Sequence, residues 1–154
     1  MAARYLVKGA HRKKRSAVRT AFFGSIIIFR MNVHGDKVMI SIEAKSFSDA
    51  DEINEKFANA LIQSVRVRGQ RVNKLTLQPG WKWSIDVKPK VGSETCQASH
   101  LGLIFSGQIC CLHDDGQKVT YSAGDAYSIA PGHDAWVVGD DVAVCYEFAG
   151  MWGE

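Results

Sequence analysis

Short stretches in which apolar and polar residues alternate cover most of the chain after residue 38. Residues 38–44, 61–68 and 72–77 alternate in this way, which is typical of half-buried β-strands. The same pattern, or a short apolar run, predicts strands at 81–87, 97–105, 108–112, 118–122, 126–130, 136–138 and 142–148. Turn residues rich in Gly, Pro and Asp separate most of these segments, so strands recur about every 8–12 residues, as in an all-β barrel.

One segment, between the predicted strands at 38–44 and 61–68, has a different period. Ile53, Phe57 and Leu61 recur every four residues, and the polar run at 48–51 can cap a helix. We therefore expect a short helix or turn before the barrel. The predicted fold class is all-β, a single small β-barrel or jelly roll, with no internal repeat and no second domain.

Length and charge narrow the classes of function. The chain has 154 residues, 46% hydrophobic and 23% charged, as expected for one ordinary globular domain. Eight of its 19 basic residues lie before Asp36, where there is no acidic residue, and the later residues carry all 16 acids. We therefore expect no nucleic-acid partner for the later part. The apolar run at 21–29 is too short to span a bilayer, so no membrane partner is expected either.

Residues 1–30 form a basic and then apolar extension, for which two interpretations stay open. The extension resembles a targeting peptide, although no small-x-small cleavage site follows it. We favour Met31 as the natural start, with 1–30 an upstream extension and 31–154 the barrel domain. Four cysteines without a C-x-x-C pair predict reduced thiols in a cytoplasmic protein.

Four groups near predicted strand ends can carry chemistry: Asp86, Cys96, His100 and His133. Cys96 and His100 share one face of a strand, but four residues span roughly 13 Å on a straight strand, so a bend near Cys96 is needed. Thiolate, imidazole and carboxylate suit a divalent metal, here zinc, iron or manganese. The alternative is that His100 is a satisfied core residue and Cys96 a small buried hydrophobe. We expect the other strand cysteines, at 110, 111 and 145, to lie in the core.

Three of the four tryptophans lie in the same half of the chain. Trp81 and Trp83, two residues apart, share a strand face, and Trp136 follows His133 closely. These rings can line an apolar pocket for a small molecule, or simply pack in the core. The chain has no Gly-rich phosphate loop and no Gly-x-Ser-x-Gly elbow, so Ser/His/Asp hydrolysis has no support.

Several of these runs resemble the cupin superfamily of small β-barrels. Gly124-Asp125, an apolar strand and Pro131 are similar to its second motif. One cupin subgroup is similar in P-G-W-x-W-S at 79–84, V-K-P at 87–89, C-Q-x-x-H at 96–100 and P-G-H-D-A-W-V-V-G-D at 131–140. In that subgroup a His commonly precedes V-K-P, where this chain has Asp86. The superfamily's usual ligands are absent here: His100 falls at the Glu position of the first motif, and Trp136 at the His position of the second.

We therefore expect a relocated site made of Asp86, Cys96, His100 and His133. The favoured hypothesis is a metal-binding cupin that acts on, or binds, a small molecule in the barrel mouth. One alternative is a non-catalytic small-molecule binding or sensing barrel without metal, with the tryptophans as its pocket, and another is a purely structural barrel. Whether the protein is an enzyme stays open, and a homodimer is a further expectation.

Overall fold

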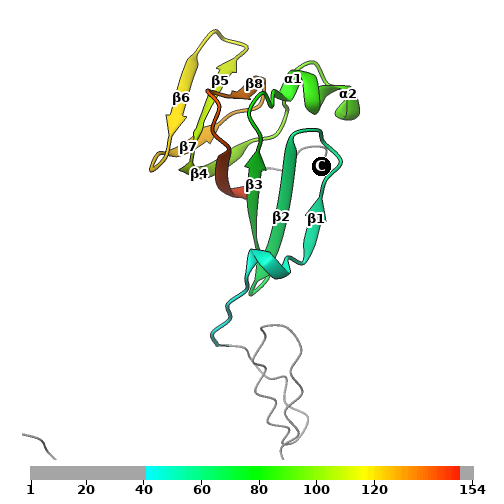
Figure 1. The fold of residues 1–154 in the computed structure, drawn as a ribbon, viewed down its shortest axis with the longest axis vertical. Coiled ribbons are helices and arrows are strands. Elements are labelled where there is room, and N and C mark those ends of the chain that lie inside the picture. Colours follow the sequence, from blue (N-terminus) through cyan, green and yellow to red (C-terminus); the bar gives the residue numbers. More distant parts are fainter. Residues whose placement is uncertain (1–40, 150–154) are drawn as a thin grey trace, which may run out of the picture.

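The computed structural model describes residues 41–149, and the predicted extension at 1–30 lies outside them. Strands dominate this part of the chain (Figure 1). They are β1 (Glu52–Asn54), β2 (Ala60–Val67), β3 (Gln70–Leu77), β4 (His100–Ser106), β5 (Gln108–His113), β6 (Lys118–Ser122), β7 (Ala126–Ile129), β8 (His133–Val137) and β9 (Ala143–Ala149). Helical segments are short: η1 (Phe47–Asp49), α1 (Trp83–Asp86) and α2 (Lys88–Val91). None of these described helices is long and apolar enough to cross a membrane.

The strands form two antiparallel sheets. The larger has the order β1-β2-β3-β9-β4-β7 and the smaller the order β6-β5-β8. Strand β9, the last in the described part of the chain, lies between β3 and β4, so early and late segments are interleaved. The prediction of an all-β fold is confirmed. Each sheet keeps two edge strands, however, so the two sheets do not close into one barrel.

Local sequence accounts for the tightest connections. Arg68 and Gly69, between β2 and β3, both have positive φ, at 49° and 82°. A two-residue turn of this kind has the twist that a β-hairpin requires, and Gly adopts its second position without strain. Two isolated bridges then attach other segments to β8. Lys82, just before α1, pairs with Trp136, and Cys96, in the loop before β4, pairs with His133.

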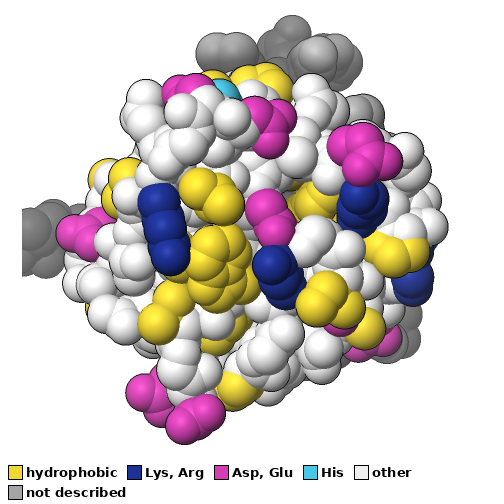
Figure 2. Space-filling model, turned by 90° about the horizontal axis from the view of Figure 1, so that it is seen from above, with side chains coloured by type: hydrophobic (Ala, Val, Ile, Leu, Met, Phe, Trp, Pro, Cys, Tyr) yellow, Lys and Arg dark blue, Asp and Glu magenta, His cyan; other side chains and the backbone are white. Residues whose placement is uncertain are grey.

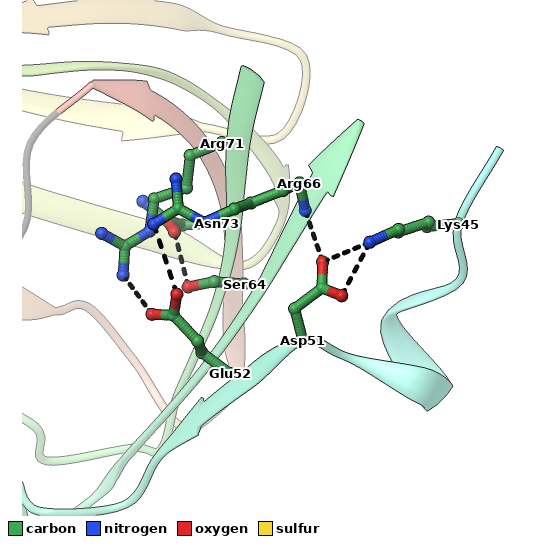
Figure 3. Close-up of polar contacts among 7 residues, drawn as sticks. All are labelled: Lys45, Asp51, Glu52, Ser64, Arg66, Arg71 and Asn73. Atoms are coloured by element: carbon green, nitrogen blue, oxygen red, sulfur yellow. Dashed lines mark hydrogen bonds and ion pairs between the residues drawn. The ribbon is translucent and has the colours of Figure 1, made fainter. Parts of the chain in front are cut away.

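Polar side chains fasten the segment before β1 to the first hairpin (Figure 3). Lys45 Nζ lies 2.7 Å from Asp51 Oδ1, and Asp51 Oδ2 accepts a hydrogen bond from the Arg66 backbone N–H. Glu52 pairs with Arg66 and Arg71 across the β1–β2–β3 surface. These ion pairs are exposed, so each contributes little to stability, and their main effect is to fix the position of the edge strand.

The core lies between the sheets and against α1. Its largest fully buried side chains include Trp81, Trp83, Ile62, Leu77 and Ile104. All four cysteines are buried and free, which confirms that Cys110, Cys111 and Cys145 belong to the core. On the face drawn in Figure 2, acidic and basic side chains are interspersed around hydrophobic patches.

Two predicted strands are wrong, and the short helix or turn expected before the barrel lies just upstream of its predicted place. Residues 41–44, the described part of the predicted strand at 38–44, form no strand. The four-residue period at 53–61 is not a helix, because Ile53 lies in β1 and pairs with Gln63 of β2; the helical turn is η1, just upstream. The predicted strand at 81–87 is instead α1. The physical reason is local: the Asp86 carboxylate accepts a hydrogen bond from the Lys82 N–H, which closes a helical turn where alternation alone indicates a strand.

Candidate metal centre

The structure brings together three of the four predicted ligands. Donor atoms of Cys96, His100 and His133 lie within 4.8 Å of one another, and all three side chains are buried. Cys96 lies in the loop before β4, His100 begins β4 and His133 begins β8. The loop is the bend that the spacing requires, because a straight strand would hold Cys96 far from His100.

Main-chain hydrogen bonds hold the loop in place. The Cys96 N–H donates to the His133 carbonyl at 2.8 Å, and the Gly132 N–H donates to the Cys96 carbonyl at 2.7 Å. Gly132 has a φ of 96°, a conformation that Gly adopts without strain, so the Pro131-Gly132 turn presents His133 directly opposite Cys96.

Both imidazoles are oriented through their Nδ1 atoms. His100 Nδ1 lies 3.1 Å from Glu147 Oε2, and His133 Nδ1 lies 2.7 Å from the Ala130 carbonyl oxygen. A proton on each Nδ1 leaves Nε2 as the lone-pair atom, which is the usual arrangement of metal-binding histidines. His100 Nε2 is 3.4 Å from Cys96 Sγ, and the two rings meet edge-on with centroids 5.2 Å apart.

Cys96 and His100 form a hydrogen-bonded pair, and burial shifts the pKa of each residue in the opposite direction from its hydrogen-bond partners. Burial raises the pKa of the Cys96 thiol, but hydrogen bonds from His100 and His133 outweigh it and lower the pKa to about 6. Burial lowers the pKa of His100, but Cys96 and Glu147 outweigh it and raise the pKa to about 10. Without a metal, the pair is therefore a thiolate and an imidazolium near neutral pH, and a metal would have to displace the proton from His100 Nε2.

Glu147 is a site residue that the sequence reasoning missed. Its side chain is 5% exposed; besides facing His100, its Oε1 accepts a hydrogen bond from the Tyr127 hydroxyl at 2.9 Å. The register pairs Glu147 on β9 with Gly102 on β4, on the same face as His100. Alternation along β9 is the sequence signal that could have identified Glu147. Glu147 lies two residues after the buried Cys145, and residues two apart on a strand share one sheet face.

Asp86, the fourth predicted ligand, lies apart from the cluster. Its two carboxylate oxygens accept hydrogen bonds from the Lys82 backbone N–H, at 2.8 Å, and from Asn59 Nδ2, at 3.2 Å. The first bond closes the α1 turn itself, and the second ties α1 to the segment before β2. The role of Asp86 in this structure is therefore to hold the turn that carries Trp83.

Two hollows adjoin the histidines. The inner cavity has a volume of about 30 Å³, with room for roughly two water molecules. It is lined by Leu75, Leu77, Trp81, Trp83, His100, Ile104, Ile109, Cys111, Tyr121, Tyr127, Ile129, His133, Ala135, Cys145 and Glu147. The outer hollow has a volume of about 230 Å³. It is lined by Cys111, His113, Asp115, Gln117, Val119, Tyr121, Ser128, Ile129, Ala130 and His133.

The predicted tryptophan pocket is present in part. Trp81 and Trp83 line the inner cavity, whereas Trp136 is not among the residues lining either hollow. Its ring lies instead near two lysines, with Lys82 Nζ 5.2 Å and Lys118 Nζ 5.3 Å from its centroid. Cys96 also lines neither hollow, whereas His100 and His133 line the inner cavity. A cation held by these three residues would therefore lie next to the cavity wall that the two histidines form.

The donor set fits a transition metal. One thiolate and two imidazoles are ligands of zinc and of divalent iron, whereas manganese prefers oxygen ligands. Three protein ligands leave a position for water or a small molecule, as in catalytic rather than structural zinc sites. The second partners of both histidines, Glu147 and the Ala130 carbonyl, are also of the kind found around bound metals.

Fold and site thus define an all-β, two-sheet protein with a buried cysteine–histidine–histidine cluster beside a small cavity. No protein-family model and no curated protein matches the chain. Among solved structures, a protein of unknown function from Rhizobium leguminosarum bv. viciae 3841 is 14% identical, with a TM-score of 0.50 over 71% of this chain and 97% of that one. This likeness concerns the fold alone.

Two enzymes of known name are among the other similar structures. Oxalate decarboxylase from Lactobacillus farciminis is 16% identical, with a TM-score of 0.49 over 77% of this chain and 36% of the enzyme. A polyketide cyclase from Streptomyces resistomycificus is 10% identical, with a TM-score of 0.49 over 71% of this chain and 78% of the cyclase. Neither likeness transfers an activity to this chain.

Proposed function

We propose that this is a metal-binding protein of the cupin type, in which Cys96, His100 and His133 hold a divalent metal beside a site for a small molecule. One observation carries the proposal: three donor atoms lie within 4.8 Å, and both imidazoles are held through Nδ1 with Nε2 left for a ligand bond. The motif resemblance supports the cupin assignment, and the all-β fold is compatible with it.

Zinc fits the donor set best, with divalent iron next, because both accept a thiolate together with imidazoles. A metal here would polarise a ligand oxygen or activate a bound water. The chain supplies the surroundings: Glu147 and the Ala130 carbonyl fix the histidine tautomers, while Leu75, Leu77, Trp81 and Trp83 give the inner cavity apolar walls.

Metal content of the full-length protein, purified under reducing conditions, tests the proposal. We expect nearly one metal per chain in the wild type and a loss of most of it in Cys96→Ser and in His100→Ala. Asp86→Asn is the matched control, because Asp86 was a predicted ligand but lies apart from the cluster; it should retain the metal. A wild type that takes up neither zinc nor iron on reconstitution would overturn the proposal.

A second function is favoured by one observation: Cys96, His100 and Glu147 form a hydrogen-bonded line like that of a cysteine nucleophile, its base and the group that orients the base. Thiol chemistry without metal is less supported, because Cys96 is 2% exposed and lines neither hollow. A protein that binds no metal but is alkylated selectively at Cys96 would favour this function over the metal site.

A further inference from the structure

The inner cavity contains a buried hydrogen-bond donor that the fold does not use. The Trp83 side chain is 2% exposed and lines the cavity, and its indole Nε1 has no hydrogen-bond partner among the described residues. A buried N–H without a partner costs free energy unless water or a ligand accepts its hydrogen bond. An indole N–H only donates, so the group that completes this site must be an acceptor.

A second hollow lies next to the cavity that holds this donor. The outer hollow and the inner cavity share four lining residues, Cys111, Tyr121, Ile129 and His133. The Tyr121 ring packs on Tyr127, with centroids 5.2 Å apart, and its hydroxyl makes no hydrogen bond to another described residue. Tyr121 and His133 therefore lie at the boundary between the outer hollow and the cavity that contains Trp83.

The two hollows differ in size and polarity. The inner cavity has room for about two waters and is mostly apolar, so it suits the compact end of a ligand. The outer hollow is several times larger and carries polar side chains, including Gln117 and Ser128, so it can hold a more polar remainder. A divalent metal would balance the charges of the Cys96 thiolate and the Glu147 carboxylate, which lines the inner cavity, and its open position would take an oxygen ligand there.

We propose that the two hollows form one ligand site for a small carbonyl or carboxylate compound, whose oxygen accepts a hydrogen bond from the Trp83 indole N–H. This deepens the proposed metal site and rests on it for the chemistry at the inner end. The position of Trp83 follows from α1, since Ser84 and Asp134 bond this helix to β8. Trp83 is thus a rigid donor rather than a mobile side chain.

Nuclear magnetic resonance of the full-length ¹⁵N-labelled protein tests this directly, because each indole N–H gives its own signal. The Trp83 signal is identified by its loss in Trp83→Phe. The probes are acetate, acetone and propylammonium, which are similar in size; only the first two have an acceptor oxygen. We expect acetate, acetone or both to shift the Trp83 signal, and propylammonium to leave it in place. A response to acetate alone would assign carboxylates, and a response to acetone alone would assign neutral carbonyls.

Variants measure how much each residue contributes to the affinity for the responding probe. Loss of one hydrogen bond should weaken binding of the responding probe about tenfold in Trp83→Phe. Trp136→Phe is the matched control and should bind as the wild type does, because Trp136 lines neither hollow. Ser128→Phe should also weaken binding by filling the outer hollow, whereas Ser48→Phe, on the distant η1, should not.

Each titration is run with zinc and without it, so that the two proposals can fail separately. If zinc binds but neither oxygen probe shifts the Trp83 signal, the N–H is merely hydrated and this inference is wrong, while the metal site stands. If zinc does not bind, the metal-free titration decides alone: a Trp83 shift supports the ligand site, and no shift overturns it.

Discussion

Glu147→Gln is the variant that most closely examines the residue orienting His100 in the proposed metal centre. The substitution keeps the shape of the side chain but removes its charge. In the wild type, the carboxylate lies 3.1 Å from His100 Nδ1 and accepts the Tyr127 hydroxyl hydrogen bond at 2.9 Å. The amide can still accept from His100, so the ring should stay in place, but the bond is no longer charge-assisted.

The expected loss of zinc affinity in Glu147→Gln follows from the burial of Glu147 and from the charge of its hydrogen bond to His100. A hydrogen bond to a charged group is about twice as strong as a neutral one, and Glu147 is 5% exposed, so solvent screens it little. Partners that orient a metal-binding histidine are worth about ten- to hundredfold in metal affinity, or about 1.4 to 2.7 kcal/mol. We expect Glu147→Gln to fall in the upper half of that range.

Competition with a chromophoric zinc chelator measures this affinity in full-length protein. Glu52→Gln is the matched control, because Glu52 is half-exposed and pairs with arginines on the sheet surface, away from the cluster. It should bind zinc as the wild type does. If Glu147→Gln also binds zinc with unchanged affinity, His100 is not a metal ligand oriented by Glu147, and the reasoning is refuted.

Three further predictions follow from the same geometry. In metal-free protein, the ultraviolet thiolate absorbance lost in Cys96→Ser should develop near pH 6 as the pH rises, because the lowered pKa keeps the thiol ionised above that value; development near pH 9 would contradict this. Gly102→Ala should lower stability by about 1 to 3 kcal/mol in urea denaturation, because a Cβ would lie 2.5 Å from the Tyr146 backbone oxygen and 2.8 Å from the Tyr127 ring; unchanged stability would contradict this close packing. Asp134→Ala should cost about 1 to 3 kcal/mol by leaving the partly buried Ser84 N–H and hydroxyl unpaired, and a loss below 0.5 kcal/mol would show that water replaces Asp134.

The fold could be predicted from the sequence because its signals are local. Alternation marks the strands, and residues such as Gly69 and Gly132 mark turns whose backbone geometry favours Gly. The segment around Trp83 is the instructive exception. Its apolar and polar residues alternate as in a strand, but the Asp86 carboxylate bonded to the Lys82 N–H makes a helical turn more favourable.

The site could be predicted only as far as local spacing reaches. Cys96 and His100 were linked by their even spacing, together with the bend that it requires, and His133 by its place after a turn. Glu147 could not be linked to His100 in this way, because the two meet only through the pairing of β4 with β9. Asp86 has the right chemistry and sequence position, but α1 directs its carboxylate to the backbone instead.

X-ray absorption at the zinc edge of the loaded full-length protein tests the central claim most directly. The account predicts one sulfur at about 2.3 Å and two imidazole nitrogens at about 2.0 to 2.1 Å, with the remaining position held by a light atom. In Cys96→Ser the sulfur contribution should disappear. A wild-type spectrum without sulfur, or with oxygen ligands alone, would contradict the assignment of Cys96, His100 and His133 as the metal centre.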